Sequence, residues 1–148
     1  MAAVRQATVS WNGDLASGKG NVSGASSGAF KNLEVSWPRR SEAEANGITS
    51  PEELLAASHA SCYAMALSAG LGRAGTPPQS LSVSARVTFD RVGDGFKVVS
   101  SELEVSGKVA GIDAAGFQQA AEAAKDGCPI SQALKGNVNL SVKASLEG

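Results

Sequence analysis

Two cysteines, Cys62 and Cys128, are the residues of this chain that could do redox chemistry, and they are its only cysteines. A cysteine thiolate attacks electrophiles, and two cysteines together can cycle between a dithiol and a disulfide. Their wide separation in sequence excludes a local Cys-x-x-Cys motif, so any pairing must arise from the tertiary fold. In a reducing compartment, such a disulfide is usually transient and either catalytic or redox-sensing.

The immediate surroundings favour Cys128 over Cys62 as the reactive thiol. Cys62 lies well inside a predicted helix, beyond the reach of the dipole at its N-terminus, and burial would raise its pKa unless a cation lies beside it. Free cysteine is often buried, so Cys62 could be an inert core residue. Cys128 follows Gly127 and precedes Pro129, where the free N–H groups of a short helix would stabilise a thiolate. A small residue tolerated at a tight junction is the alternative for Cys128.

Four polar residues could assist these thiols. His59 precedes Cys62 by one helical turn and could be the base of a Cys–His acyl-transfer enzyme, although a hydrogen-bonded or partly exposed histidine is the simpler interpretation. Arg39 and Arg40 are adjacent cations that could equally be solvated surface charges. Glu52 has no helix-capping duty and is free to hold an arginine through a bidentate fork. No ligand spacing for a metal and no nucleotide-binding motif is present, so neither a metal nor a cofactor is expected.

The elements that must position these residues begin with a predicted β-meander. Short apolar alternations at 7–11 and 33–37 stand in a stretch rich in Gly and Ser, and this meander has little core of its own. It needs cover, either from the rest of the domain or from a second subunit. The polar segment 39–49 is expected to be irregular.

A strong helix start follows at 50–53, where the sequence SPEE supplies a serine N-cap, a proline in the first turn and a capping-box glutamate. The long Ala-rich helix that it opens should continue to 70–75. Because small residues occupy nearly all of its faces, it should be buried.

The second half of the chain predicts strands around a second helix. Apolar and polar residues alternate over 81–89 and again after the turn at 93–95, with a phase break near Ser100–Ser101 that could be a bulge. Asp113 caps a helix that should stop at Gly127 with a left-handed C-cap.

A helical turn over PISQAL and an alternating strand over 137–146 close the chain. Together the elements predict one α+β domain spanning 1–148. Its parts are the meander, an antiparallel sheet, a long central helix and a shorter second helix.

Composition excludes several classes of partner. The chain has 148 residues, of which 43% are hydrophobic and 18% are charged, and its formal net charge is −1. These values are typical of a globular domain and argue against a nucleic acid or an anionic membrane as the partner. The N-terminus lacks the apolar run of a signal peptide, and no stretch approaches the roughly 20 apolar residues of a spanning helix, so a cytoplasmic location is expected.

Three stretches carry a resemblance to a known family. They are TSPEELLAASHASCYAMALS at 49–68, GCPISQALKGNVNL at 127–140 and WNGDLASGKGNVS at 11–23. Taken in their order along the chain, they resemble the OsmC/Ohr family of thiol peroxidases, which comprises osmotically inducible proteins and organic hydroperoxide resistance proteins. The sequences HASCYAMALS and CPISQALK are more similar to the osmotically inducible branch.

Carried over by position, the resemblance implies roles for five residues. It makes Cys62 the peroxidatic cysteine, Cys128 the resolving cysteine and Glu52 the glutamate that holds the catalytic arginine. Arg40 is the first candidate for that arginine and Arg39 the second. The resemblance also implies an OsmC-like intertwined homodimer, in which the meander packs across the partner and the active sites lie at the interface.

The activity that the resemblance implies is reduction of hydroperoxides. Organic or lipid-derived peroxides are expected to suit the site better than hydrogen peroxide. A cellular dithiol is expected to reduce the disulfide, and the family is associated with lipoyl-type dithiols as well as small thiols. Such an enzyme would protect against oxidative and osmotic stress. The competing class is a dimeric binding protein for an apolar ligand, in which both thiols are incidental.

Overall fold

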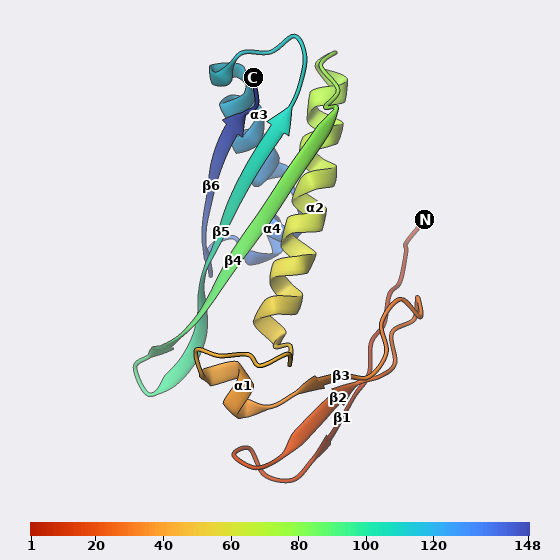
Figure 1. Cartoon of the computed structure of the whole chain (residues 1–148), viewed down its shortest axis with the longest axis vertical. Coiled ribbons are helices and arrows are strands. Elements are labelled where there is room, and N and C mark those ends of the chain that lie inside the picture. Colours follow the sequence, from red (N-terminus) through yellow and green to blue (C-terminus); the bar gives the residue numbers. More distant parts are fainter. The chain divides into compact units, whose positions relative to one another are not determined.

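The computed structural model describes all residues from 1 to 148, in two compact units, Met1–Leu54 and Leu55–Gly148 (Figure 1). In the first unit, the strands β1 (Val9–Asn12), β2 (Lys19–Val22) and β3 (Leu33–Val35) form an antiparallel sheet in the order β1-β2-β3. The predicted meander is therefore confirmed.

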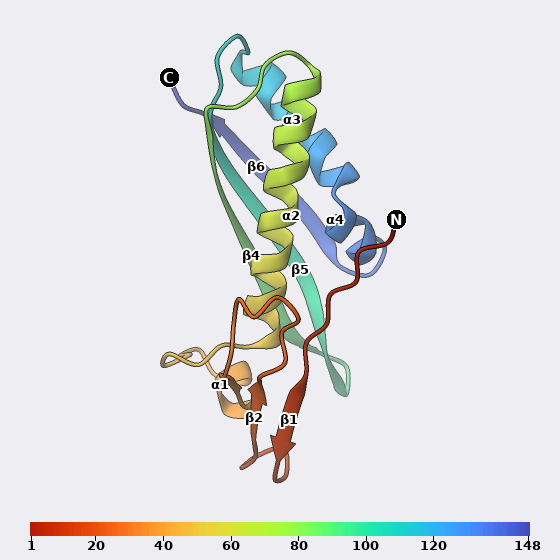
Figure 2. The same cartoon turned by 90° about the vertical axis from the view of Figure 1, so that its right-hand side faces the viewer.

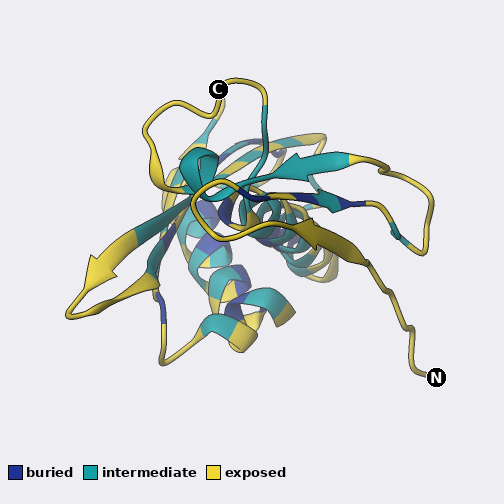
Figure 3. Ribbon diagram, turned by 90° about the horizontal axis from the view of Figure 1, so that it is seen from below, coloured by how far each residue is buried: buried dark blue, intermediate teal, exposed yellow.

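The meander has almost no core of its own, as its sequence predicts. Every residue from Met1 to Ser17 is exposed, and this segment is yellow beside the N label in Figure 3. Val22 is the one buried apolar residue of the three strands. Because so little apolar surface is removed from water, these strands need cover to be stable.

A short helix, α1 (Trp37–Ser41), takes in the first three residues of the segment 39–49, whereas the rest of that segment is irregular as predicted. Pro38 is the second residue of its first turn, and its carbonyl accepts a hydrogen bond from the backbone N–H of Glu42. A helix of five residues is too short to show an apolar period in the sequence. It places Arg39 and Arg40 in its last turn, where a cation interacts favourably with the helix dipole.

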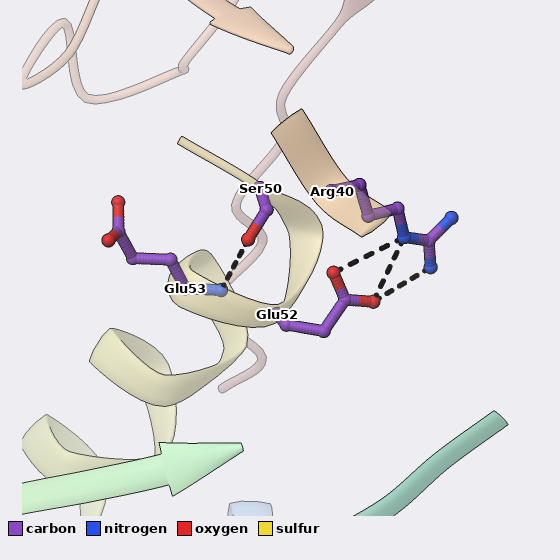
Figure 4. Close-up of polar contacts among 4 residues, drawn as sticks. All are labelled: Arg40, Ser50, Glu52 and Glu53. Atoms are coloured by element: carbon purple, nitrogen blue, oxygen red, sulfur yellow. Dashed lines mark hydrogen bonds and ion pairs between the residues drawn. The ribbon is translucent and has the colours of Figure 1, made fainter. Parts of the chain in front are cut away.

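The long helix α2 (Pro51–Arg73) begins where the sequence predicts. Of the two reciprocal contacts of the predicted capping box, only the one made by the serine is present. The Ser50 hydroxyl accepts a hydrogen bond from the backbone N–H of Glu53 at 3.1 Å (Figure 4). The Glu53 carboxylate does not reach back to Ser50 and instead accepts from the Thr49 hydroxyl at 2.6 Å. The serine cap alone thus satisfies one of the free donors of the first turn.

The expectation that α2 is buried on nearly all faces is wrong for the single chain. Its fully buried residues form one stripe at intervals of one turn, namely His59, Tyr63, Leu67 and Leu71. Met65, by contrast, is 72% exposed. By length and composition α2 could cross a membrane, which the sequence reading overlooked, but its apolar stripe belongs to the core of the second unit. It is a core helix.

The sheet of the second unit consists of β4 (Ser80–Val92), β5 (Gly95–Lys108) and β6 (Asn139–Leu146), in that order. β4 and β5 form an antiparallel hairpin, and its register shifts between Thr88 and Phe89, opposite the predicted phase break. β5 and β6, however, are parallel, so the prediction of an antiparallel sheet is wrong for this pair. The intervening helices form the crossover connection that parallel neighbours require.

Those helices are α3 (Ala114–Gly127) and α4 (Pro129–Leu134). The Asp113 carboxylate caps α3 by accepting from the backbone N–H of Gly116 at 2.8 Å, as predicted. The predicted left-handed C-cap at Gly127 is wrong, because Gly127 is the last helical residue and does not have positive φ. Cys128, in an extended conformation, connects α3 to α4 directly.

The core of the second unit lies between the helices and one face of the sheet (Figure 1, Figure 2). α2 contributes Tyr63, Leu67 and Leu71, β5 contributes Leu103 and Val105, and α3 contributes Phe117, Ala121 and Ala124. The Tyr63 hydroxyl, which is buried, donates a 2.9 Å hydrogen bond to the Ala121 carbonyl. The two helices are thus joined by apolar packing and by one buried polar contact.

Gly107 of β5 lets α3 approach the sheet closely, which predicts the effect of adding one methyl group. A Cβ at this position would lie 2.5 Å from Cζ of Phe117, whose ring is buried. We therefore expect Gly107→Ala to lower the free energy of unfolding by about 1–3 kcal/mol through overpacking. Urea denaturation measures the loss, and Gly95→Ala on the same strand is the control, because its Cβ meets nothing within 4 Å. Equal effects of the two substitutions would contradict the close approach.

Candidate active site

The fold brings the two cysteines together from positions distant in sequence. Cys62 lies in the middle of α2 and is partly buried, whereas Cys128 is the N-cap of α4 and is fully buried. Both thiols are free, and their side chains lie near enough for Cys128 to influence the pKa of Cys62. The tertiary pairing that their spacing required is therefore present as a contact between two reduced thiols.

The surroundings of Cys62 raise the pKa of its thiol above the usual 9.0. Burial is the largest cause, and the neighbouring Cys128 side chain adds to it. The backbone N–H of Ile130 acts in the opposite direction, because its positive end is directed towards the Cys62 sulfur and favours the thiolate. Within this environment Cys62 is mostly a thiol at neutral pH, so its reactivity as a nucleophile requires a cation.

The N-terminus of α4 therefore lowers the pKa of the Cys62 thiol, whereas the sequence favoured an effect on Cys128. Ile130 belongs to the first turn of α4, and its N–H is one of the free donors expected to stabilise a Cys128 thiolate. In the structure this donor faces Cys62, and the Cys128 side chain makes no capping hydrogen bond. Cys128 is also inaccessible to solvent, so the preference for Cys128 as first nucleophile is not supported.

His59 is a fully buried, hydrogen-bonded histidine rather than a catalytic base. Its Nδ1 lies 2.7 Å from the Ser101 hydroxyl and its Nε2 lies 2.8 Å from the Ser131 hydroxyl. Both ring nitrogens face serine hydroxyls and neither contacts the Cys62 sulfur, so the geometry gives no support to a Cys–His pair with His59 as base. Neither serine was expected from the sequence, because Ser101 and Ser131 lie 42 and 72 residues from His59.

Burial lowers the pKa of His59 below its ordinary 6.5, which predicts a pH dependence of stability. At a pH between the pKa of His59 in the folded chain and its pKa in the unfolded chain, the imidazole is protonated only in the unfolded chain. The free energy of unfolding should therefore be constant above pH 6.5 and fall as the pH decreases below it. The slope is at most about 1.4 kcal/mol per pH unit. Urea denaturation between pH 7.5 and pH 5 measures it.

His59 is the only histidine of the chain, which provides a direct control. His59→Gln should lack this slope, because carboxylates titrate at lower pH. If the variant kept the same slope between pH 6.5 and pH 5, another group would be responsible.

Arg40 and Glu52 form a bidentate ion pair in the first unit (Figure 4). Arg40 Nε lies 3.1 Å and 3.2 Å from the two carboxylate oxygens of Glu52, and Nη2 lies 2.8 Å from Oε1. Glu52 is 7% exposed, so its charge is compensated mainly by this guanidinium. The fork fixes the plane of the Arg40 side chain, as two parallel N–H···O contacts do for arginine generally.

Arg39 is oriented differently. Its Nη1 lies 3.3 Å from the exposed carboxylate of Glu42 and 3.4 Å from the carbonyl of Glu44. Of the two adjacent arginines, Arg40 is therefore the one that Glu52 holds. No group of three or more His, Cys, Asp and Glu side chains in the structure is arranged to hold a metal ion.

Comparison with known proteins places these residues in a family context. The family model of OsmC-like proteins matches residues 44–143, a range that includes Glu52 and both cysteines. The chain is 42% identical over 130 residues to peroxiredoxin OsmC of Escherichia coli, covering 88% of this chain and 89% of the relative. It is 30% identical over 110 residues to an organic hydroperoxide resistance protein of Xanthomonas axonopodis, covering 74% and 75%.

A solved structure of a further organic hydroperoxide resistance protein has the same fold as this chain. The crystal structure of the organic hydroperoxide resistance protein OhrB of Bacillus subtilis superposes with a TM-score of 0.73 at 25% identity, covering 95% of this chain and 98% of the other. The higher identity to the osmotically inducible relative agrees with the branch that the motifs predicted. The chain belongs to the OsmC/Ohr family.

Proposed function

We propose that the protein is a thiol peroxidase that reduces hydroperoxides with Cys62 as the attacking residue and Cys128 as its disulfide partner. The observation that carries this proposal is the contact between the two free thiols, one partly exposed and the other fully buried. The partly exposed sulfur can meet a peroxide, and the buried one can reach only its neighbour. The names of the relatives, a peroxiredoxin and an organic hydroperoxide resistance protein, support the same chemistry.

The reaction has two oxidative steps. The Cys62 thiolate attacks one oxygen of the hydroperoxide, the O–O bond breaks, and the alkoxide leaves as an alcohol after taking a proton. Cys62 is thereby oxidised by two electrons to a sulfenic acid. The Cys128 sulfur then attacks the Cys62 sulfur, the S–O bond breaks, and water leaves with the Cys128 proton. A dithiol reductant restores both thiols by exchange and is itself oxidised to a disulfide.

In this proposal Arg40 lies beside Cys62 during the first step. Its positive charge lowers the pKa of the thiol, which burial otherwise raises, and its N–H groups orient the peroxide. Glu52 keeps the guanidinium in the required plane through the bidentate contact. Arg39, whose contacts are to Glu42 and Glu44, is not needed for the reaction.

An organic hydroperoxide is the substrate class that fits the apolar surroundings of Cys62. The neighbours of this thiol in the core are small apolar and aliphatic side chains, among them Ala66 and Ile130. A dithiol of the lipoyl type is the proposed reductant. We place this reaction in the cytoplasm, as part of the response to oxidative and osmotic stress, with residues 1–148 acting as one domain.

A homodimer is the proposed assembly. Two features support it: the meander exposes most of its residues, and an apolar groove of about 480 Å³ lies between α2 and α3. Small residues line this groove, including Ala66, Ala69, Ala120 and Ala123. A second copy that covered them would supply the burial that α2 lacks in the single chain. The active sites would then lie at the interface.

A thiol count separates a peroxidase from a binding protein for an apolar ligand. The reduced protein is treated with one equivalent of cumene hydroperoxide, and free thiols are titrated before and after. We expect two thiols per chain to fall to none while one cumyl alcohol per chain appears. A binding protein would keep both thiols and release the peroxide unchanged.

Removal of the resolving thiol should change the product on Cys62. We expect Cys128→Ser to complete the first step and then accumulate sulfenic acid, which further peroxide converts to sulfinic acid. Intact-protein mass spectrometry after graded peroxide measures the added oxygens. Since Cys128 is fully buried, Cys128→Ala provides a second variant that introduces no hydroxyl. If neither variant accumulated a sulfinic acid, Cys128 would not be the resolving residue.

A further inference from the structure

Two contacts join α2 to α4 side by side. One is the contact between Cys62 and Cys128, and the other is the hydrogen bond between His59 and Ser131 at 2.8 Å. His59 stands one turn before Cys62 on α2, and Ser131 stands one turn after Cys128 at the start of α4. The two contacts between the helices are therefore about one helical turn, or 5 Å, apart.

The histidine contact is fully buried and satisfied. His59, Ser101 and Ser131 are each 1% exposed or less, and no buried side-chain nitrogen or oxygen in the structure lacks a partner. A neutral imidazole donates from one ring nitrogen and accepts at the other, so His59 joins β5 to α4 through two directional bonds. Breaking either bond would leave a buried polar group unsatisfied, which makes sliding of α4 unfavourable.

α4 is joined to α3 through Cys128 but buries little surface of its own. It has six residues, and Ser131 is its only buried one. Apolar packing is not directional, so it would allow a short helix to shift by a fraction of an ångström. Formation of a disulfide requires the two sulfurs to meet at a defined distance and dihedral angle.

We propose that His59 is a positioning residue, whose hydrogen bond to Ser131 holds α4 in the register that keeps the Cys128 sulfur against Cys62 while the disulfide forms. This inference rests on the proposed peroxidase function. It adds a residue to that function which touches neither peroxide nor sulfur. The bond matters for the second oxidative step and not for the first.

The consequence is a competition at the Cys62 sulfenic acid. Attack by Cys128 gives the disulfide and water, whereas attack on a second hydroperoxide gives the sulfinic acid and another alcohol. A well-placed Cys128 wins because the reaction within the chain has a high effective concentration. If α4 is loosened, the disulfide forms more slowly and the same amount of peroxide yields more sulfinic acid.

Ser131→Ala tests the inference, because it removes the bond to α4 and leaves the contact of His59 with Ser101. The rate of the first step is measured from peroxide consumption, and the products are measured by mass spectrometry after graded cumene hydroperoxide. We expect an unchanged first step and overoxidation at about tenfold lower peroxide than in the unmodified protein. Ser131→Thr, which keeps the hydroxyl, should restore most of the resistance.

A control separates positioning from general loss of stability. Val105→Ala removes two buried methyl groups from β5 within the same core, and Val105 makes none of the polar contacts of His59. Urea denaturation of Val105→Ala and Ser131→Ala establishes that both are folded at the assay temperature. If Val105→Ala were overoxidised as readily as Ser131→Ala, or if Ser131→Ala behaved like the unmodified protein, the inference would be overturned.

A second measurement needs no peroxide. Equilibration with mixtures of reduced and oxidised glutathione gives the effective concentration of one thiol towards the other, and we expect it to be about tenfold lower in Ser131→Ala. An equal value in both proteins would overturn the positioning role. If the unmodified protein formed the disulfide with glutathione but did not consume cumene hydroperoxide, the proposed peroxidase function would fail while the positioning role survived.

Discussion

Cys62→Ser is expected to abolish hydroperoxide reduction, lowering the rate by at least about a thousandfold. A serine hydroxyl is far less nucleophilic than a thiolate at neutral pH, and Cys128 cannot substitute because it is fully buried. The measurement is the consumption of cumene hydroperoxide with a dithiol as reductant. The substitution is nearly isosteric, so the free energy of unfolding should change by no more than about 2 kcal/mol, within the range of most single substitutions.

Cys128→Ser is the matched control for this experiment. It removes the other sulfur with the same chemical change and should still reduce one equivalent of peroxide per chain, because the first step needs only Cys62. A Cys62→Ser protein that kept its rate, with Cys128→Ser inactive, would reverse the two roles. That result would agree with the preference for Cys128 that the local sequence indicated.

Arg40→Ala is expected to slow the first step at neutral pH by about tenfold to a hundredfold. Burial already raises the pKa of the Cys62 thiol, and an opposite charge nearby typically lowers such a pKa by about one to three units. Loss of that charge should move the pH profile of the rate upward, so that the rates of variant and unmodified protein converge at alkaline pH. Stopped-flow measurement of peroxide consumption between pH 6 and pH 10 tests both parts.

Arg39→Ala is the control, since it removes the same charge from the adjacent position of α1. Arg39 contacts Glu42 and Glu44, so its loss should leave the pH profile within about twofold of the original. Arg40→Lys should fall between the two, because lysine keeps the charge but cannot form the bidentate fork with Glu52. A shift in Arg39→Ala alone would assign the catalytic role to Arg39.

Local signals in the sequence were sufficient to predict most of the helices and strands. Ser50 and Asp113 cap their helices as predicted, because capping depends on residues within one turn. The strands β4 and β5 follow from their alternation, and the register shift lies opposite the phase break near Ser100. These features depend on neighbours in the chain, which a single sequence contains.

Features that depend on distant residues were not predictable in the same way. The parallel pairing of β6 with β5 is decided by the path of the connecting helices, and alternation within β6 is the same for either direction. Burial of α2 was overestimated because small residues allow close packing on all faces without showing which faces find a partner in the chain. The helix α1 was missed because five residues show no period.

The same distinction applies to the site. The bidentate contact between Arg40 and Glu52 agrees with the expectation that Glu52 is free to hold an arginine. The local preference for Cys128 assumed that its side chain caps α4, and in the structure this side chain makes no capping hydrogen bond. Neither Ser101 nor Ser131 carried a signal that linked it to His59, since each lies far away in sequence. The roles of these residues in catalysis remain predictions that the variants above test.

Mass spectrometry of the peroxide-treated protein tests the central claim most directly. The reduced chain is treated with one equivalent of cumene hydroperoxide, blocked with iodoacetamide and digested without reduction. We predict a single cross-linked species that joins the peptides containing Cys62 and Cys128, formed within one chain. Recovery of both cysteines as alkylated thiols after the peroxide has been consumed would contradict the mechanism.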